Sequence, residues 1–212
     1  MKTELNTWQD IGSYISEFTV NANLLNNLSR ISDDVDIRDF VSKGQLASKL
    51  WASRLFDKHI TQSKVAVCGG WYGLLPAILL HKNHEKRNNF TSIDIDSTCA
   101  PIANAFNAEH YFTGEFYADT QDMYTADYTD YDVIVNTSCE HIADLPAWLE
   151  TLPAGKRVLL QSNNFFECDQ HINCVHNMHE FKEQCTERAT VLDTQTLVMP
   201  NYTRFMILCL TK

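Results

Sequence analysis

Residues 64–80 read KVAVCGGWYGLLPAILL and join two apolar runs through a turn that holds three glycines. The valine-rich start, residues 64–68, predicts a strand, and the run that begins at Leu74 predicts a helix. A tight glycine turn before a helix N-terminus lets backbone amides approach a ligand closely, and the helix dipole favours a negative group there. Residues 69–73 therefore form a candidate ligand-binding loop; a plain strand-to-helix turn would have the same pattern.

Glycine is scarce in this chain of 212 residues, which contains only 7 of them. Gly69, Gly70 and Gly73 lie within five residues of one another, so they mark a place where the backbone geometry demands glycine. The formal net charge is -10, which disfavours binding to long nucleic acids because their phosphates are repelled. Small or cationic substrates suit this charge better.

Short β-rich runs alternate with helical ones after residue 61, as in βαβ units of a parallel sheet. The predicted strands lie at residues 64–68, 90–94, 115–118, 131–135 and 157–161. The predicted helices lie at residues 74–84, 99–109, 142–151 and 173–186, with a short turn at 120–124. Two adjacent runs at 189–199 and 203–210 predict an antiparallel hairpin. The predicted fold class is α/β, a Rossmann-like, seven-stranded, mostly parallel sheet with helices on both faces and a C-terminal antiparallel hairpin.

Residues 1–60 lack a convincing strand and predict an N-terminal helical cap, which leaves residues 61–212 as the sheet domain. The apolar residues at helical spacing in the cap are Trp8, Ile11, Ile15, Phe18, Leu46, Leu50 and Leu55. The polar segment 42–49 has two interpretations. It covers the active site, or it is the solvated face of a helix that turns Trp51 inward.

Asp94 ends the second predicted strand, 21 residues after Gly73. In doubly wound nucleotide sites an acid at this place accepts hydrogen bonds from the ribose hydroxyls. The glycine loop and Asp94 together predict an adenosine-containing cofactor. The alternative is that Asp94 is a loop or capping acid, but Asp96 and Ser97 suit that role before the next helix.

Residues 61–212 resemble the class I S-adenosylmethionine-dependent methyltransferases. The resemblance rests on the loop 69–73, on Asp94, on residues 118–120, on the strand 133–135 followed by Asn136, and on the final hairpin. It implies S-adenosylmethionine as cofactor, with the loop around its methionine half, Asp94 on its ribose and Asp119 with Thr120 on its adenine. The residues that it places at the cofactor are Cys68, Gly69, Gly70, Trp71, Tyr72, Gly73, Asp94, Ile95, Asp119, Thr120, Asn136 and Thr137.

The loop departs from the family pattern at two positions. Val67 stands where the family has an acid, and Trp71 replaces the middle glycine. These two changes alter the part of the loop that would hold the methionine half of the cofactor. They suggest a second hypothesis, transfer of the aminocarboxypropyl group instead of the methyl group. A third hypothesis is a non-catalytic S-adenosylmethionine-binding module. An NAD-dependent oxidoreductase is disfavoured by the terminal hairpin.

Polar residues follow the fourth and fifth strands, at the sheet edge where ligands bind in open α/β folds. Glu140 and His141 resemble the pair that follows strand 4 in many small-molecule methyltransferases, with His141 as a base and Glu140 either orienting it or binding a cationic substrate. The alternative is that the pair simply begins the next helix. Asn163 and Asn164 are candidate substrate-binding residues or part of a plain loop.

The densest group of cysteines and histidines is Cys168, His171, Cys174, His176 and His179. We expect no metal there, because no Cys-x2-Cys pair occurs and a helix would turn these residues to different sides. The sequence favours a methyltransferase for a small-molecule substrate. It predicts no membrane span and, without a secretory leader or paired cysteines, a cytoplasmic protein.

Overall fold

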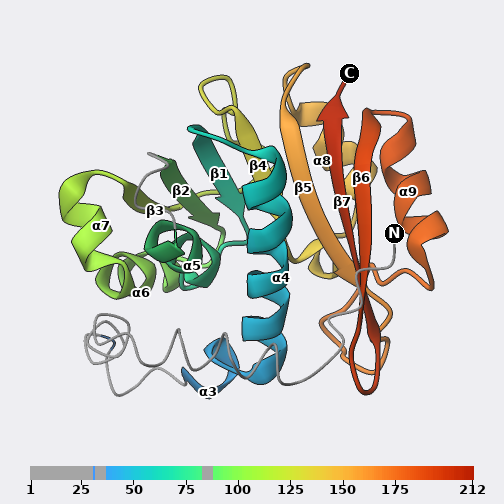
Figure 1. The fold of residues 1–212 in the computed structure, drawn as a ribbon, viewed down its shortest axis with the longest axis horizontal. Coiled ribbons are helices and arrows are strands. Elements are labelled where there is room, and N and C mark those ends of the chain that lie inside the picture. Colours follow the sequence, from blue (N-terminus) through green and yellow to red (C-terminus); the bar gives the residue numbers. More distant parts are fainter. Residues whose placement is uncertain (1–30, 32–36, 83–87) are drawn as a thin grey trace.

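Seven strands form one sheet in this computed structural model, which describes residues 31, 37–82 and 88–212 (Figure 1). The strands are β1 Lys64–Cys68, β2 Asn89–Asp94, β3 Phe116–Thr120, β4 Val133–Asn136, β5 Arg157–Asn163, β6 Ala189–Val198 and β7 Thr203–Thr211. Their order is β3-β2-β1-β4-β5-β7-β6. Strands β1 to β5 run parallel to one another, and β7 runs antiparallel to both β5 and β6. The predicted fold class is confirmed.

Helices cover both faces of the sheet. They are α3 Ile37–Phe40, α4 Lys43–His59, α5 Leu74–Lys82, α6 Cys99–Phe106, α7 Ala108–Thr113, α8 Leu145–Thr151 and α9 Met178–Thr186, with a 3-10 turn η1 at Cys139–His141. Successive residues of β1 point to opposite faces of the sheet, and each face carries its own hydrophobic cluster. Val65 and Val67 join the side chains of α4, α5 and α6 on one face, whereas Ala66 and Cys68 join those of α8 and α9 on the other.

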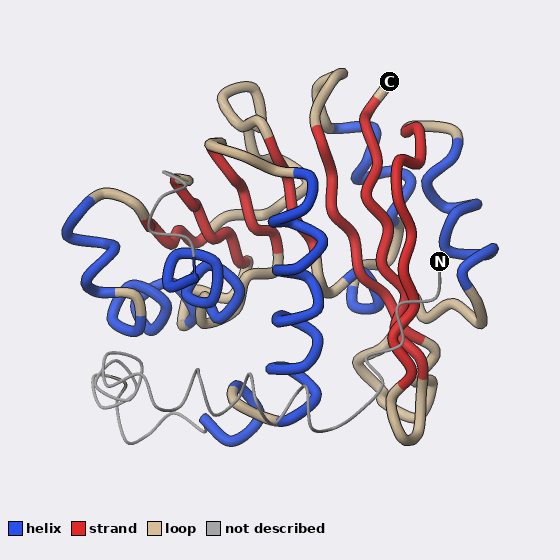
Figure 2. Tube along the Cα trace, in the orientation of Figure 1, coloured by secondary structure: helices blue, strands red, loops and turns tan. Residues whose placement is uncertain are grey.

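Helix α4 is the longer of the two described helices of the predicted cap, and it packs on the sheet (Figure 2). Trp51, Leu55 and Phe56 are buried in the same cluster as strand residues. A polar contact supports the packing, since Ser48 Oγ donates to Gln161 Oε1 at 2.7 Å. Trp51 lies inward, as the second interpretation expects, but the polar segment is not a solvated face, because Ser48 is buried and Ser42 and Gln45 line the cleft described below. The four predicted apolar positions before residue 20 lie outside the described residues.

Three predicted helix bounds were wrong. The helix expected at residues 99–109 is two helices, because Asn107 ends α6 and its side chain donates to Gly73 O and Ala103 O. The helix expected from residue 142 begins at Leu145, where the Asp144 side chain accepts from the amide of Ala147. The helix expected from residue 173 begins at Met178, after the cap residue Asn177. Each bound is set by a side-chain hydrogen bond that the apolar periodicity does not report.

Among the described residues, no helix combines the length and the apolar composition that crossing a membrane requires.

Candidate active site

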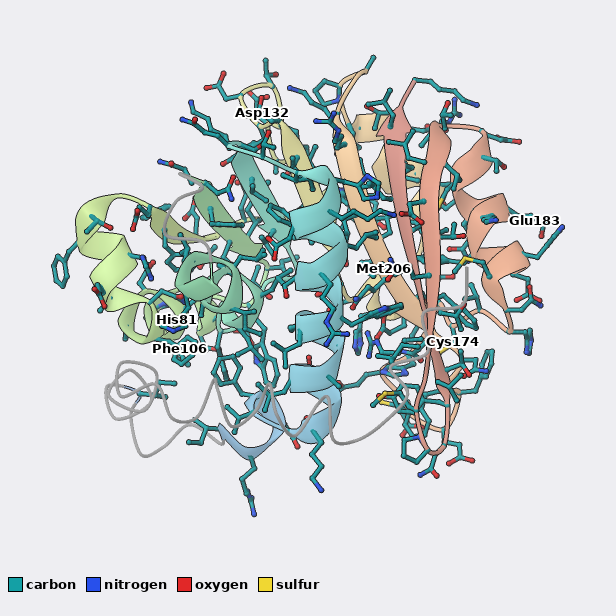
Figure 3. The ribbon with its side chains drawn as sticks, viewed as in Figure 1. His81, Phe106, Asp132, Cys174, Glu183 and Met206 are labelled. Carbon is teal, nitrogen blue, oxygen red and sulfur yellow. The ribbon has the colours of Figure 1, made fainter. Side chains whose placement is uncertain are left out.

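A cleft of about 1010 Å³ opens at the carboxyl ends of the parallel strands. Gly69 follows β1, Asp94 ends β2, and Asn136 ends β4, and all three line it. Figure 3 labels one residue near each end of the central strands, Asp132 just before β4 begins and Cys174 after β5 ends. The cleft lies on the Cys174 side, where the topology of a parallel sheet predicts a ligand site.

The glycine loop takes its shape from three residues with positive φ, Gly69 at 59°, Trp71 at 48° and Gly73 at 77°. Trp71 thus adopts the left-handed conformation that glycine tolerates best. Gly70 is required for another reason. A Cβ atom there would lie 2.0 Å from Ser92 Oγ and 3.1 Å from the carbonyl oxygen of Val67. The loop therefore packs tightly against β2.

Asp94 is joined to the glycine loop by hydrogen bonds. Its Oδ2 accepts from the amide of Trp71 at 2.9 Å, and its Oδ1 accepts from the amide of Asp96 at 3.1 Å. Both oxygens keep further lone pairs, and the side chain lines the cleft. The next residue, Ile95, is 73% exposed and also lines the cleft. A fixed carboxylate and an apolar side chain thus lie side by side at the cleft wall.

Five of the predicted cofactor residues line the cleft, namely Gly69, Trp71, Asp94, Ile95 and Asn136. Cys68 is buried, its Sγ lies 3.2 Å from Tyr128 Oη, and burial raises the pKa of its thiol to about 12. Gly70 and Thr137 border a small void of about 30 Å³ behind the loop. Tyr72 packs on the ring of Phe40.

Asp119 and Thr120 do not line the cleft in this structure, contrary to the prediction for the end of β3. Strand β3 extends to Thr120, which pairs with Asp94, and the Asp119 side chain is exposed and accepts from the amide of Thr120. The cleft is lined instead by the next four residues, Gln121, Asp122, Met123 and Tyr124. The physical reason is that the strand continues for two residues beyond Ala118, where the predicted strand ends.

Lys49 of α4 reaches the segment after β4, where its Nζ donates to Thr137 Oγ1 at 2.7 Å. Burial, and then the charge of Arg204, lowers the pKa of Lys49 to about 7, while Glu140 opposes the shift. The helix that was predicted as a cap therefore supplies an ionisable group next to the glycine loop.

Glu140 is buried and directed into the protein. Its Oε1 accepts from Asn163 Nδ2 at 2.6 Å and from Arg204 Nη2 at 3.1 Å. Asn163 is buried as well, and Asn164 Oδ1 accepts from the amide of Thr203 at 2.6 Å. Glu140, Asn163 and Asn164 do not line the cleft. The structure places these predicted catalytic and substrate-binding residues in a network that supports the cleft wall.

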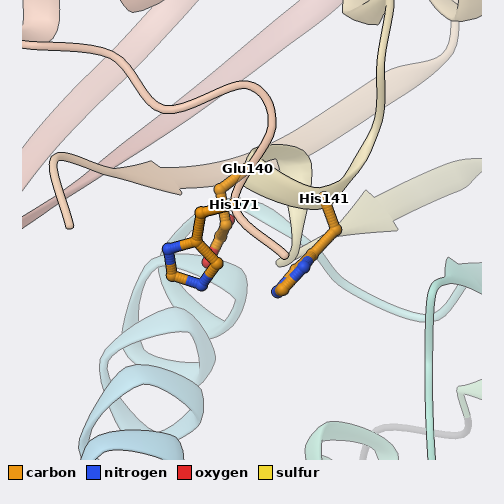
Figure 4. A group of neighbouring side chains, drawn as sticks. All are labelled: Glu140, His141 and His171. Carbon is orange, nitrogen blue, oxygen red and sulfur yellow. The ribbon is translucent and has the colours of Figure 1, made fainter. Parts of the chain in front are cut away.

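His141 lines the cleft and meets His171, with ring centroids 4.7 Å apart (Figure 4). Its Nδ1 lies 3.1 Å from the carbonyl oxygen of Gln170. A carbonyl only accepts, so Nδ1 carries the hydrogen and Nε2 keeps its lone pair. Partial loss of solvent around the ring lowers the pKa of His141, and the negative charge of Glu140 opposes this shift.

Two members of the Cys/His group, Cys174 and His171, meet, and the two histidines that follow them point elsewhere. Cys174 Sγ lies 3.7 Å from His171 Nδ1. His176 stacks on Phe166, and His179 pairs with Glu183 on the exposed side of α9. His171 instead joins Glu140 and His141 from a distant part of the sequence.

Residues from α3, from the start of α4 and from the loop after β5 complete the cleft. Asp39, Ser42 and Gln45 come from α3 and the start of α4, and Gln170 with Ile172 come from the loop after β5. The polar composition of residues 42–45 could have identified Ser42 and Gln45 as cleft residues. The loop after β5 could be recognised only by His171, because a loop position alone does not say which side chains face a ligand.

No family model and no curated protein matches the sequence. Many solved structures match the fold. An N-methyltransferase, NodS, from Bradyrhizobium japonicum WM9 in complex with S-adenosylhomocysteine has a TM-score of 0.65 at 12% identity, over 90% of this chain and 99% of that one.

The chain has the fold of the class I S-adenosylmethionine-dependent methyltransferases. A magnesium protoporphyrin IX methyltransferase from Synechocystis PCC 6803 with bound S-adenosylhomocysteine aligns over 95% of this chain and 100% of that one, with a TM-score of 0.63 and 11% identity. The 1,6-didemethyltoxoflavin-N1-methyltransferase of Burkholderia thailandensis, solved with 1,6-didemethyltoxoflavin and S-adenosylhomocysteine, has a TM-score of 0.62 at 16% identity, over 78% and 79% of the two chains. This methyltransferase fold is shared with enzymes of different acceptors, so the acceptor of this chain is not given by its fold.

Proposed function

We propose that the protein is an S-adenosylmethionine-dependent methyltransferase that acts on a small molecule bound in the cleft. The observation that carries this proposal is the position of Asp94. Its carboxylate ends β2, is held by the amides of Trp71 and Asp96, and lines the cleft beside the glycine loop. That is the arrangement that binds the ribose of an adenosine cofactor in doubly wound folds.

The residues at the cleft fit S-adenosylmethionine. At Gly69 the nearest atom that a Cβ would meet is Ser138 Cβ at 3.8 Å, so the loop backbone is open toward a ligand. Asp94 would hold the ribose, and the exposed Ile95 would lie against the adenine. Four acids, Asp39, Asp94, Asp96 and Asp122, line the cleft and favour a cationic sulfonium. The aromatic face of Trp71 adds a cation–π attraction of about 0.5–2 kcal/mol.

The cofactor supplies an electrophilic methyl group, and the protein holds the acceptor in line with it. A cleft of about 1010 Å³ lies at the upper end of the usual range for small-molecule sites, about 300–1,000 Å³. It therefore has room for the cofactor and a compact acceptor together. Val67, at the family's acid position, is buried among apolar residues and offers no hydrogen bond to the cofactor.

Isothermal titration calorimetry of the full chain with S-adenosylhomocysteine tests the cofactor assignment. We expect one site per chain, and NAD should not compete for it. The absence of heat and of a thermal shift at millimolar S-adenosylhomocysteine would contradict the proposal.

Acceptor screening with methyl-labelled S-adenosylmethionine tests the reaction. Methyl transfer releases S-adenosylhomocysteine. Release of methylthioadenosine would instead identify aminocarboxypropyl transfer, and cofactor binding without any product would favour a binding module.

A further inference from the structure

Three side chains that bind metals well lie close together beside the cleft: His141 and His171 line it, and Glu140 is buried next to them. Glu140 and His141 come from η1, and His171 comes from the loop between β5 and α9 (Figure 4). One donor atom from each lies within 4.8 Å of the others. Among the described residues, this is the single group of three such side chains that is close enough to hold an ion.

Each of the three is anchored through one polar atom and leaves another available. Glu140 Oε1 accepts from Asn163 and Arg204, whereas Glu140 Oε2 is buried and has no hydrogen-bond partner among the described residues. His171 Nδ1 lies 2.8 Å from the carbonyl oxygen of Phe165, as His141 Nδ1 lies near that of Gln170. Both histidines therefore carry the hydrogen on Nδ1 and keep the lone pair on Nε2. Metal-binding histidines and carboxylates are oriented in this way by their second hydrogen bond.

The unpartnered oxygen of Glu140 leaves room for one more partner, and a cation is one that it can accept. A buried carboxylate oxygen without a hydrogen bond is costly, since it has lost its water and gained nothing in return. The ion pair with Arg204 occupies the other oxygen only. A cation between Glu140 and the two histidines would satisfy this oxygen and both Nε2 lone pairs together.

We propose that Glu140, His141 and His171 form a binding site for a divalent first-row transition-metal ion. Two imidazoles and one carboxylate favour ions such as Fe²⁺, Co²⁺ or Zn²⁺ over Mg²⁺ and Ca²⁺, which prefer sites made of oxygen. Bonds of about 2.0–2.2 Å require donor atoms about 3–3.5 Å apart, so the three donor atoms move closer together when the ion binds.

Three protein ligands leave coordination positions open, as in catalytic metal sites. His141 and His171 both line the cleft, so these positions face the space that would hold the acceptor. Any use of the ion in methyl transfer rests on the proposed function, but binding of the ion does not. The two are therefore tested separately.

Cobalt binding to the full chain, freed of its affinity tag and treated with EDTA, tests the site. Without S-adenosylmethionine present, Co²⁺ should bind one ion per chain with a visible absorption band, and Zn²⁺ should displace it. His171→Ala should weaken Co²⁺ binding by more than about 100-fold, since changes in the second shell of metal sites already cost about 10–100-fold. His179→Ala is the matched control, because this histidine is exposed on α9 and lies outside the group.

Thermal unfolding of each apo variant shows whether it is folded. Should His171→Ala not fold, His141→Ala gives the same test at an exposed ring. Wild-type protein without a cobalt band, or a folded His171→Ala or His141→Ala variant that binds Co²⁺ as tightly as wild type, would overturn the proposal. Calorimetry with S-adenosylhomocysteine on the same EDTA-treated protein reports on the cofactor alone, so failure of one assignment is distinguishable from failure of the other.

Discussion

Arg204 at the start of β7 donates from Nη2 to Oε1 of Glu140 at 3.1 Å, and both side chains are buried. The same nitrogen donates to the carbonyl oxygen of Thr137 at 3.2 Å. One guanidinium thus joins the C-terminal hairpin to the segment after β4 that forms the cleft wall. The hairpin that completes the fold is also a support of the candidate site.

Replacing Arg204 by alanine should lower the free energy of unfolding by about 3–5 kcal/mol, because the carboxylate of Glu140 then remains buried without its partner. Urea unfolding measures the change. Arg188→Ala is the control, since the pair of Arg188 with Glu150 is exposed and such pairs contribute about 1 kcal/mol or less. Equal losses in the two variants would show that the Arg204 pair is not specially buried in solution.

Asp94→Ala should weaken the binding of S-adenosylhomocysteine by about 1–3 kcal/mol, through lost hydrogen bonds to a charged acceptor. Titration calorimetry checks the affinity. Asp127→Ala provides a matched loss of charge, because Asp127 also accepts from a backbone amide two residues on but lies outside the cleft lining. An Asp94 variant that binds as tightly as the Asp127 variant would remove Asp94 from the cofactor site.

Gly70→Ala should destabilise the protein by about 1–3 kcal/mol, as overpacking does. The added Cβ would lie 2.0 Å from Ser92 Oγ. The cost should be smaller in a Ser92→Gly background, and thermal or urea unfolding of the four proteins gives the coupling energy.

Gly114→Ala serves as the control in both backgrounds. It introduces a left-handed alanine at φ 76°, but nothing lies within 4 Å of its Cβ, so its cost of about 1 kcal/mol should not depend on residue 92. A Gly70→Ala cost that is equally independent of residue 92 would show that the loop is not packed against β2 as described.

The fold could be predicted because its signals are local. The valine-rich strands are buried on both faces, and the spacing from Gly73 to Asp94 follows from one helix between two parallel strands. The helix bounds were less accurate where a side chain from another turn decides them, as Asn107 does by binding Gly73 O.

The cleft lining could be predicted only in part. Asp94 follows from strand order, but Glu140 is directed inward by Arg204, which lies 64 residues further along the chain. Lys49 and His171 approach the site from elements whose position depends on tertiary packing. The sequence places polar residues at the carboxyl ends of the strands, where the cleft lies. Which of these residues face the cleft depends on contacts between distant segments.

Lys49 should make the stability depend on pH in alkaline solution. Burial lowers its pKa to about 7 in the folded protein, against an ordinary value of about 10.4 in the unfolded chain. Below pH 7 the lysine is protonated in both states, and the cost of burying the charge is present in full. Between pH 7 and 10 the unfolded chain holds a proton that the folded chain has released, so the free energy of unfolding rises with pH.

Lys49→Met removes this dependence, so the unfolding free energy of wild type minus that of the variant should increase from pH 7 to pH 10. Urea unfolding of both proteins in EDTA at pH 6.5, 8 and 9.5 measures the difference, and groups common to both proteins cancel. Lys58→Met on the same helix is the control, because its ammonium is exposed and its difference from wild type should stay constant over this range. Parallel curves for Lys49→Met and wild type would mean that the Lys49 ammonium reaches water in solution and keeps its ordinary pKa.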